Sequence, residues 1–572
     1  MSVPQASAHT GRPAAAGLFA EQLRHTVVDL WRARVVFVFT FLFPLTWLVV
    51  IGFLAGNATV DETGGVRVMQ FVTPTAAVMG VLYAAFPTVA TALATAREQG
   101  VLKRVRGTPL PAWIYLAGRV GGAVVFALCS VLTMLLVGTV VYDVQILWRT
   151  APATVVTIAV GIACFAALGL AVAALSPTAA VAEAVSIAAA VALGFVSGLF
   201  IVGDMPGWAD SIAAVFPLKP FAEAVQEQFD PFAAGGGWDL GALAVMTAWT
   251  FAASLVAVRA FGWDPARGST GRASAPPVAS RRADRMLDAD VPGRPSTARL
   301  VLGRIAWTTR AAARDPGWVF FAVALPVGLY AFIMAVLPDG AVTVADVPPE
   351  LSGAAGMAAW GAAVTAFVNM PEAVVRARDR GVLKRLRGTP LGPVGFMAGH
   401  TVSTLWIALV TAVLVVAVGV VFFGLVLTWP GVFLAAAVVV LGTATLAACG
   451  FALAAVLPSS KAVSAVGLAI LLPLAFFSDI FFLGDTPGWM QTVGSAFPLK
   501  HFSNSLAAAL DPSGPRILWG AIAVMAAWLV AAALVATRTF RWGPRAEHGA
   551  PSAAPLGLRR RGSGYARNSA RR

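Results

Sequence analysis

The segment Gly100-Val101-Leu102-Lys103-Arg104-Val105-Arg106-Gly107-Thr108-Pro109-Leu110 occurs twice in the chain. It returns as Gly381-Val382-Leu383-Lys384-Arg385-Leu386-Arg387-Gly388-Thr389-Pro390-Leu391, and only the sixth residue differs. The offset of 281 residues persists elsewhere, since Phe216-Pro217-Leu218-Lys219 returns as Phe497-Pro498-Leu499-Lys500. Agreement at one fixed offset across separate segments indicates a tandem duplication. The fold is therefore predicted to contain two copies of one unit.

The composition of the chain places it in a membrane. Hydrophobic residues make up 58% of it and charged residues 12%, with a mean hydropathy of +0.80, outside the range of soluble globular proteins. The apolar runs are continuous rather than alternating, and a helix satisfies its own backbone in lipid. We therefore expect an all-α polytopic membrane protein with about 12 transmembrane helices, each needing about 20 residues. They are predicted at 35–55, 70–95, 113–141, 152–175, 180–202 and 240–260, and again at 318–337, 353–375, 394–425, 431–456, 463–483 and 517–537. The two long third spans leave room for an interfacial turn.

The spans divide the chain into five parts. We expect a cytoplasmic N-terminus at 1–34, a first six-helix domain at 35–262 and a second at 301–543. Between them, 263–300 is rich in Pro, Ser, Gly and Arg and is predicted to be a flexible cytoplasmic linker. The tail at 544–572 is basic and predicted to be disordered.

An amphipathic helix is predicted ahead of each domain. Phe19, Leu23, Val27 and Leu30 recur at helical spacing, which indicates a helix on the inner membrane surface. Trp307 belongs to a weaker equivalent before the seventh span. The N-terminal residues carry no cleavable signal pattern, so we expect the first span to be an uncleaved anchor.

Lysine and arginine predict the orientation. In the first half, one set of connecting segments carries ten of them and the other set carries three. The ten are Arg24, Arg32, Arg34, Arg97, Lys103, Arg104, Arg106, Arg259, Arg267 and Arg272, and the three are Arg67, Arg149 and Lys219. The positive-inside rule places the ten and both termini in the cytoplasm, in a multi-pass protein of the cell membrane. Six spans per copy give both copies the same orientation, so they are predicted to be parallel repeats.

Several classes of function are disfavoured. The net charge of +14 lies between and beyond apolar spans, where it suits anionic lipid headgroups rather than nucleic acid. Cys129, Cys164 and Cys449 lie inside apolar runs, which excludes a disulfide framework or metal cluster. We find no Gly-x-x-x-x-Gly-Lys-Ser/Thr phosphate loop and no nucleophile–base pair. We therefore expect no catalytic residue, metal or cofactor on this chain.

The basic loop between the second and third spans is the best-matched part of the repeat. An acid precedes it in both copies, Glu98 and Asp379. From Glu98 to Arg106 we expect a short helix, with the acid at its positive end and Gly107 and the following proline ending it. Its apolar face would comprise Val101, Leu102 and Val105. An orientation signal explains the basic residues but not the near-identity, so we interpret the loop as a docking surface for a cytoplasmic partner.

A second matched element follows the fifth span. Asp204, Pro206, Gly207 and Trp208 match Asp485, Pro487, Gly488 and Trp489. Pro and Gly break helices and Trp favours the headgroup level, so a broken pair of short interfacial helices is predicted. An aromatic-anchored loop and a gate are both open interpretations.

With these two elements the chain resembles the membrane subunit of ABC-type transporters, in the type 2 exporter permease family. The first shared motif is an acid-Gly loop followed by Pro, here Glu98, Gly100 and Pro109, and Asp379, Gly381 and Pro390. The second is Pro-x-Trp followed by Pro-Leu, here Pro206, Trp208, Pro217 and Leu218, and Pro487, Trp489, Pro498 and Leu499. The resemblance covers nearly all of 17–540. Lys219 and Lys500 depart from the commoner small polar residue, which leaves their role open.

The resemblance implies that the inner loop is a coupling helix docking in a groove of a separate ATPase subunit. The residues implied are Glu98, Gly100, Val101, Leu102, Arg104, Pro109, Asp379, Gly381, Val382, Leu383, Arg385 and Pro390. Two loops imply two ATPase copies per chain, with ATP and magnesium bound on that partner. The matched spacing of the second element in both copies makes its residues candidates for an outer gate: Pro206, Trp208, Pro217, Leu218, Pro487, Trp489, Pro498 and Leu499.

The spans lack fixed charges, which favours a hydrophobic or amphipathic substrate (a drug, an antibiotic or a lipid-like molecule) exported from the cytoplasm or inner leaflet. By family position the cavity residues are Met79, Tyr83, Phe86, Phe195 and Phe476, and packed or lipid-facing aromatics are an equal alternative.

Two rival functions stay open. A proton-coupled transporter of the major facilitator type needs titratable groups at mid-membrane, which cost about 2.5–3.5 kcal/mol each. Glu183, Glu372 and Asp479 lie near span ends, and none recurs at the 281 offset, which disfavours this alternative. A non-transporting membrane scaffold is the other. ATPase-dependent transport in reconstituted membranes separates all three.

Overall fold

The computed structural model describes residues 15–32, 38–55, 58–59, 65–108, 111–199, 206–262, 297–337, 347–383, 392–481 and 487–539. The first residues, most of the expected linker (263–296) and the basic tail (544–572) lie outside them. Within the described ranges the regular structure is helical, apart from an isolated antiparallel bridge between Thr59 and Arg67. The predicted all-α class is confirmed.

Among the described residues, each half contains one helix ahead of its spans and six spans, with three further short helices in the first half and two in the second. The first half comprises α1 (Ala15–Arg32), η1 (Val38–Leu42), α3 (Phe43–Ala55), α4 (Met69–Glu98), α5 (Val101–Arg106), α6 (Ala112–Tyr142), α7 (Ala151–Leu175), α8 (Ala179–Val196), α9 (Gly207–Val215), α10 (Leu218–Gln228) and α11 (Leu240–Ala260). The second comprises α13 (Thr297–Ala313), α14 (Pro316–Val319), η3 (Phe320–Ala324), α15 (Leu325–Val336), α16 (Pro349–Ala363), η4 (Val364–Asn369), α17 (Met370–Asp379), α19 (Gly392–Phe423), α20 (Trp429–Val456), α21 (Ser460–Phe477), α22 (Gly488–Ser495), α23 (Pro498–Leu510) and α24 (Trp519–Thr539).

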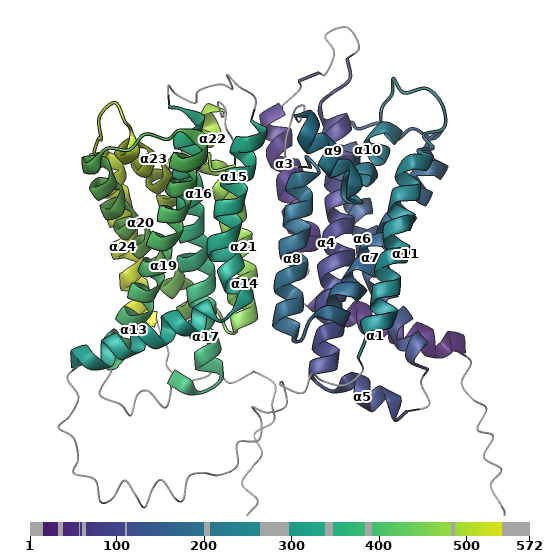
Figure 1. Cartoon of the computed structure of the whole chain (residues 1–572), viewed down its shortest axis with the longest axis horizontal. Coiled ribbons are helices and arrows are strands. Elements are labelled where there is room, and N and C mark those ends of the chain that lie inside the picture. The colour runs from purple at the N-terminus through teal and green to yellow at the C-terminus, as the bar shows by residue number, and fades with distance from the viewer. Residues whose placement is uncertain are drawn as a thin grey trace, which may run out of the picture.

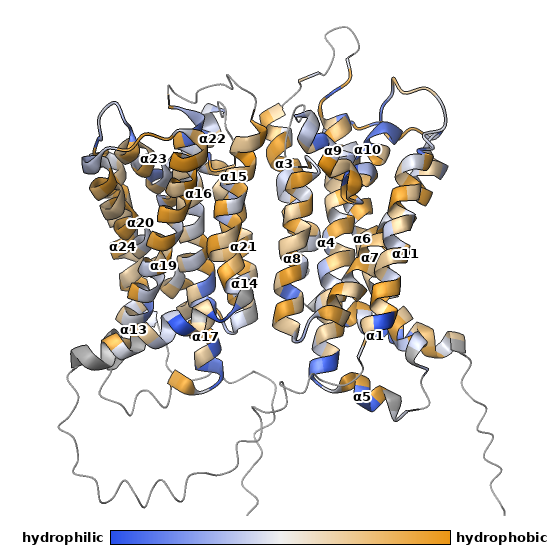
Figure 2. Cartoon of the chain, in the orientation of Figure 1, coloured by the Kyte–Doolittle hydropathy of each residue, from blue (hydrophilic) through white to orange (hydrophobic). Residues whose placement is uncertain are grey.

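The helices have the length and composition of membrane spans. Among the described residues, ten are long and apolar enough to cross a bilayer, and Thr40–Ala55 and Ala462–Phe477 are shorter apolar helices at the first and eleventh predicted spans. Figure 2 shows their apolar flanks, with hydrophilic residues gathered near α5 and α17. The allowance for a turn in the third spans was wrong: α6 and α19 are single helices, because no proline interrupts either beyond its first turn.

In the part of the chain that the structure describes, three π-helical segments interrupt the spans, and each ends two residues before a proline. The prolines are Pro44, Pro326 and Pro371. Proline lacks an N–H and its ring crowds the carbonyl four residues earlier, so widening the preceding turn relieves the clash. These segments lie in the first span of each half and in the second span of the second half.

The carbonyls released by the first two prolines find the same substitute donor. Ser130 Oγ donates to Thr40 O at 2.7 Å, and Thr411 Oγ1 donates to Ala322 O at 2.9 Å. Each pair joins the third span to the first, and a glycine of the second span gives the hydroxyl room. A Cβ on that glycine in the second half, Gly361, would lie 2.7 Å from Thr411 Cγ2. A buried carbonyl in lipid requires such a partner, so this staple holds three spans together.

The halves stand side by side and meet along two pairs of helices (Figure 1). On one side α8 packs against α14, η3 and α15 of the second half. On the other, α21 packs against η1 and α3 of the first. We call the end that holds α5 and the C-terminus of α17 the loop end, and the end that holds α9, α10, α22 and α23 the opposite end (Figure 1).

Interfacial helices α1 and α13 lie at the loop end and pack against α6 and α19 (Figure 1). Helix α1 approaches α6 closely because α6 carries glycine there: a Cβ on Gly121 would lie 3.2 Å from Leu23 Cδ1. Helix α13 starts at Thr297, so the predicted linker ends four residues early. The Thr297-Ala298-Arg299-Leu300 segment lacks the helix-breaking Pro and Gly that precede it.

Candidate coupling loops and outer segments

The basic loop begins with a sharp turn, not with its helix. Helix α4 ends at Glu98, and Gly100 has a φ of +68° ahead of α5. Gly381 has the same φ after α17. Glycine occupies this left-handed region without a Cβ penalty. The predicted helix from Glu98 to Arg106 was therefore wrong at its start, and Gly107, with a φ of −85°, is not the left-handed cap.

An arginine fixes the end of the second span in both halves. Arg97 and Arg378 are buried, with 6% and 1% of their surface exposed. Arg97 donates to Ser176 O, at the C-terminus of α7. Arg378 donates to Ala454 O at 3.1 Å and to Leu457 O at 2.9 Å, at the C-terminus of α20. A cation at a helix C-terminus satisfies free carbonyls and complements the helix dipole.

The neighbouring acid holds the helix that follows. Glu98 Oε2 accepts a hydrogen bond from Ala179 N at 2.8 Å, at the start of α8. Asp379 Oδ2 accepts from Ser460 N at 3.3 Å, at the start of α21. The acids thus cap the fifth spans and not the loop helices. Each Arg-acid pair joins the loop to the corner between the fourth and fifth spans.

The apolar residues of the loop face the rest of the chain. Leu102 and Leu383 are fully buried, and Leu102 packs with Leu93 and Tyr115 while Val101 is half-buried. Val382 is half-buried as well. The apolar face is therefore an anchor for α5 rather than a free docking surface, because burying it against the spans removes it from water.

The exposed part of the first loop is basic. Lys103 and Arg104 are exposed, and Gly107 and Thr108 are exposed beside them. Three expected coupling residues, Pro109, Arg385 and Pro390, lie outside the described residues.

The predicted pair of short helices after each fifth span is confirmed. Helices α9 and α10 follow in the first half and α22 and α23 in the second, at the opposite end (Figure 1). Pro206 and Pro487 precede α9 and α22, Pro217 precedes α10, and Pro498 begins α23. Trp208 and Trp489 are 53% and 44% exposed, whereas Leu218 and Leu499 are fully buried.

A tryptophan of the last span holds the turn between these helices in both halves. Trp249 Nε1 donates to Val215 O, and Trp528 Nε1 donates to Ala496 O, both at 2.9 Å. Trp249 also stacks on Phe216, with ring centroids 6.2 Å apart. The two turns match at the 281 offset but the tryptophans do not, so sequence alignment missed them.

The lysine that follows Pro-Leu is buried in both halves and paired with different acids. Lys219 pairs with Asp210 of α9 and with Glu223, at 3.4 Å. Lys500 Nζ lies 2.8 Å from Asp479 Oδ2, at the end of α21, and 3.4 Å from Gln491 Oε1.

At the 281 offset Asp210 matches Gln491, and Asp479 matches a glycine, Gly198. Gly198 and Asp479 share the left-handed backbone, with φ of +69° and +56°. The two buried lysines therefore take their counter-charge from different elements: from α9 and α10 in the first half, and from the residue that follows Ser478 after α21 in the second. A buried ammonium requires such a counter-charge.

The five expected cavity residues lie at the core and between the halves. Met79, Tyr83 and Phe86 are buried in the first half's core. Phe476 belongs to the second half but packs in that same core, and Phe195 packs edge-on against Phe332 of the second half at 6.4 Å. They do not line the apolar pocket that the structure contains between α3 and α21.

Comparison with protein families matches residues 19–229 and 301–510 to the ABC-2 type transporter membrane family. The two matched segments together cover more than half of the chain, one in each half of the fold. The chain belongs to this family, and it contains two fused copies of its membrane domain. A search among curated proteins gave no match. The chain is thus a multi-pass permease component of an ABC transporter.

Proposed function

We propose that this chain is the membrane permease of an ATP-driven exporter for a hydrophobic or amphipathic molecule, such as a drug, an antibiotic or a lipid-like compound. Two separate ATPase subunits bind it, one at each basic loop, and carry ATP and magnesium. The loop end and both termini face the cytoplasm of the cell membrane.

The observation that carries the proposal is the pair of Arg-acid anchors. Each one ties a basic loop to the start of α8 or α21, and these two helices form the contact between the halves. A partner that displaces the loop therefore pulls on the helices whose separation opens the chain. If the basic residues served only to set the orientation in the membrane, the loops would not have to be tied to α8 and α21.

The distribution of charge supports the proposed orientation and an apolar cargo. In the first half, the connecting segments at the loop end carry ten Lys and Arg residues and those at the opposite end carry three. This difference supports a cytoplasmic location for the loop end. The buried lysines are neutralised by acids at the opposite end, so the core between the halves offers apolar surface. Such a surface favours a molecule that partitions into lipid.

The test is transport by the purified chain in liposomes, with and without the candidate ATPase subunit. We expect export only with the ATPase and ATP. Uncoupler-sensitive transport without an ATPase would favour the proton-coupled alternative, and ATPase binding without any transport would favour a scaffold.

A further inference from the structure

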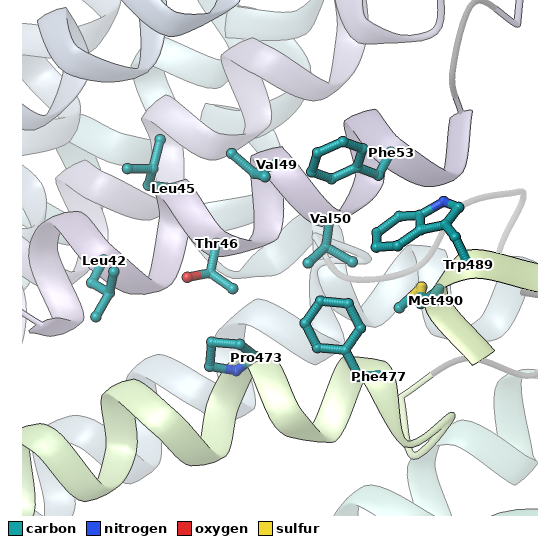
Figure 3. Close-up of a pocket in the computed structure, with 10 residues that line it drawn as sticks. All are labelled: Leu42, Leu45, Thr46, Val49, Val50, Phe53, Pro473, Phe477, Trp489 and Met490. Atoms are coloured by element: carbon teal, nitrogen blue, oxygen red, sulfur yellow. The ribbon is translucent and has the colours of Figure 1, made fainter. Parts of the chain in front are cut away.

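A cavity of about 280 Å³ lies between the two halves near the opposite end, where the proposed function assigns no residue. Figure 3 shows its two walls, one from the first half and one from the second. The first wall is η1 and α3, and the second is α21 and α22. The lining residues are Leu42, Leu45, Thr46, Val49, Val50, Phe53, Pro473, Phe477, Trp489 and Met490.

The lining selects uncharged ligands. Among the ten lining side chains, two carry a polar group: the hydroxyl of Thr46 and the indole N–H of Trp489. None of the ten is charged. An ion there would lose its hydration without a partner, which is costly. The ligand must therefore bury an apolar surface.

The aromatic residues select a ring. Phe53 and Trp489, from opposite walls, meet edge to face with centroids 5.1 Å apart, and Phe477 meets Trp489 at 6.1 Å. Met490 adds a thioether beside them (Figure 3). Aromatic pairs favour such edge contacts and methionine sulfur favours ring edges, so an inserted ring finds matching partners on both walls.

The volume limits the size of the ring. A closed apolar cavity of about 150 Å³ holds one benzene, whereas pockets for whole drug-sized molecules span about 300–1,000 Å³. The cavity of about 280 Å³ is open on one side, so it has room for two fused rings while the remainder of a larger molecule extends out of it.

The residues that form this cavity are not repeated at the matching interface, as far as the described residues show. The first spans of the two halves are aligned by matching Pro44 with Pro326, the prolines that follow η1 and η3. In this alignment Ala335 stands where the first half has Phe53. At the 281 offset Val196 and Ala209 stand where the second half has Phe477 and Met490. Of the three aromatic positions of this site, the matching interface keeps only Trp208. Phe332, which packs against Phe195, stands there in place of Val50.

We propose that this one-sided cavity binds an uncharged aromatic group of up to two fused rings, carried by the exported molecule. The proposal rests on the proposed function for the identity of the cargo. Binding itself needs neither ATPase nor ATP, so it is tested separately from transport.

The experiment is photolabelling of the purified full chain in lipid nanodiscs with naphthalene carrying a diazirine, followed by mapping of the labelled peptides. We expect labels on α3 and on α21 or α22, and at least a tenfold loss of label in excess 2-naphthalenemethanol. Diffuse labelling without competition would overturn the proposal. So would labelling of the same helices by a phospholipid with a diazirine on its acyl chain that naphthalene does not displace.

Two variants and one matched control complete the test. Val49→Trp fills the cavity and should reduce the label at least tenfold, whereas Ala331→Trp, at the matching position of the second half, should leave it unchanged. Phe477→Ala enlarges the cavity and should increase labelling by an anthracene probe over the naphthalene one. Equal labelling of Val49→Trp and the natural chain, or loss of label in Ala331→Trp, would contradict a one-sided site. Transport by the natural chain in the absence of specific label would overturn this site while leaving the proposed function intact.

Discussion

Removing the acid that neutralises a buried lysine should destabilise the second half. Lys500 is 7% exposed and lies 2.8 Å from Asp479, which is 22% exposed. Removal of one partner from a buried ion pair costs about 3–5 kcal/mol, and the partial exposure of Asp479 places Asp479→Asn near the lower end, about 3 kcal/mol. Lys500→Met with Asp479→Asn should recover most of this loss, because an apolar replacement of the whole pair is often neutral.

The first half supplies a second, sharper variant. Asp479→Gly combined with Gln491→Asp reproduces the part of the Lys219 site that Gly198 and Asp210 form, while Asn504 stays at the position of Glu223. We expect this relocated acid to restore most of the stability that Asp479→Gly alone removes. Asp479→Gly also controls for backbone strain, because glycine accepts the φ of +56° at this position.

The assay is reversible unfolding of the purified chain in mixed micelles, with the free energy of unfolding compared across the cycle. An ordinary surface substitution changes the free energy of unfolding by up to about 0.5 kcal/mol. If Asp479→Asn changes it by no more than this, the reasoning is refuted. Failure of the relocated acid to restore stability would show that Lys500 does not need a counter-charge.

Three further predictions concern the loops, the staples and the orientation. Glu98→Lys and Asp379→Lys place a cation at the start of α8 or α21, so each should preserve membrane insertion but weaken ATPase association and transport. The double variant should be worse, and full transport by it in liposomes would contradict the coupling role. Ser130→Ala and Thr411→Ala should each cost about 0.6–1.7 kcal/mol in unfolding assays, the range for hydrogen bonds between membrane helices, with Ser130→Thr as the conservative control. A cysteine at Ser274, in a cysteine-free background, should resist an impermeant thiol reagent in intact cells and react after lysis; labelling before lysis would reverse the orientation.

The sequence was sufficient for the architecture because the relevant signals are local or repeated. Continuous apolar runs predicted the spans to within six residues, the largest error being the fifth spans, where α8 and α21 end six residues before the predicted ends. The 281 offset predicted two equivalent halves. Pro and Gly predicted the broken helices of the outer segments, since their effect on the backbone does not depend on distant residues.

The contacts within the candidate sites could not be predicted, because they join residues far apart in the chain. Glu98 precedes α5 in sequence, yet its partner Ala179 lies 81 residues away. Periodicity identified the apolar face of Leu102 but not whether spans or a partner would cover it. The repeat of Lys219 as Lys500 was visible, whereas the exchange of its acid required the positions of α9 and α21 in space.

The subunit ratio of the assembled transporter tests the central claim most directly. Each half carries its own anchored loop, at Glu98 and Asp379, so native mass spectrometry of the purified complex should give two ATPase subunits per chain. Glu98→Lys or Asp379→Lys should shift the population toward complexes with one ATPase subunit per chain. A complex of the natural chain with a single ATPase subunit, or with none under conditions that support transport, would contradict the account.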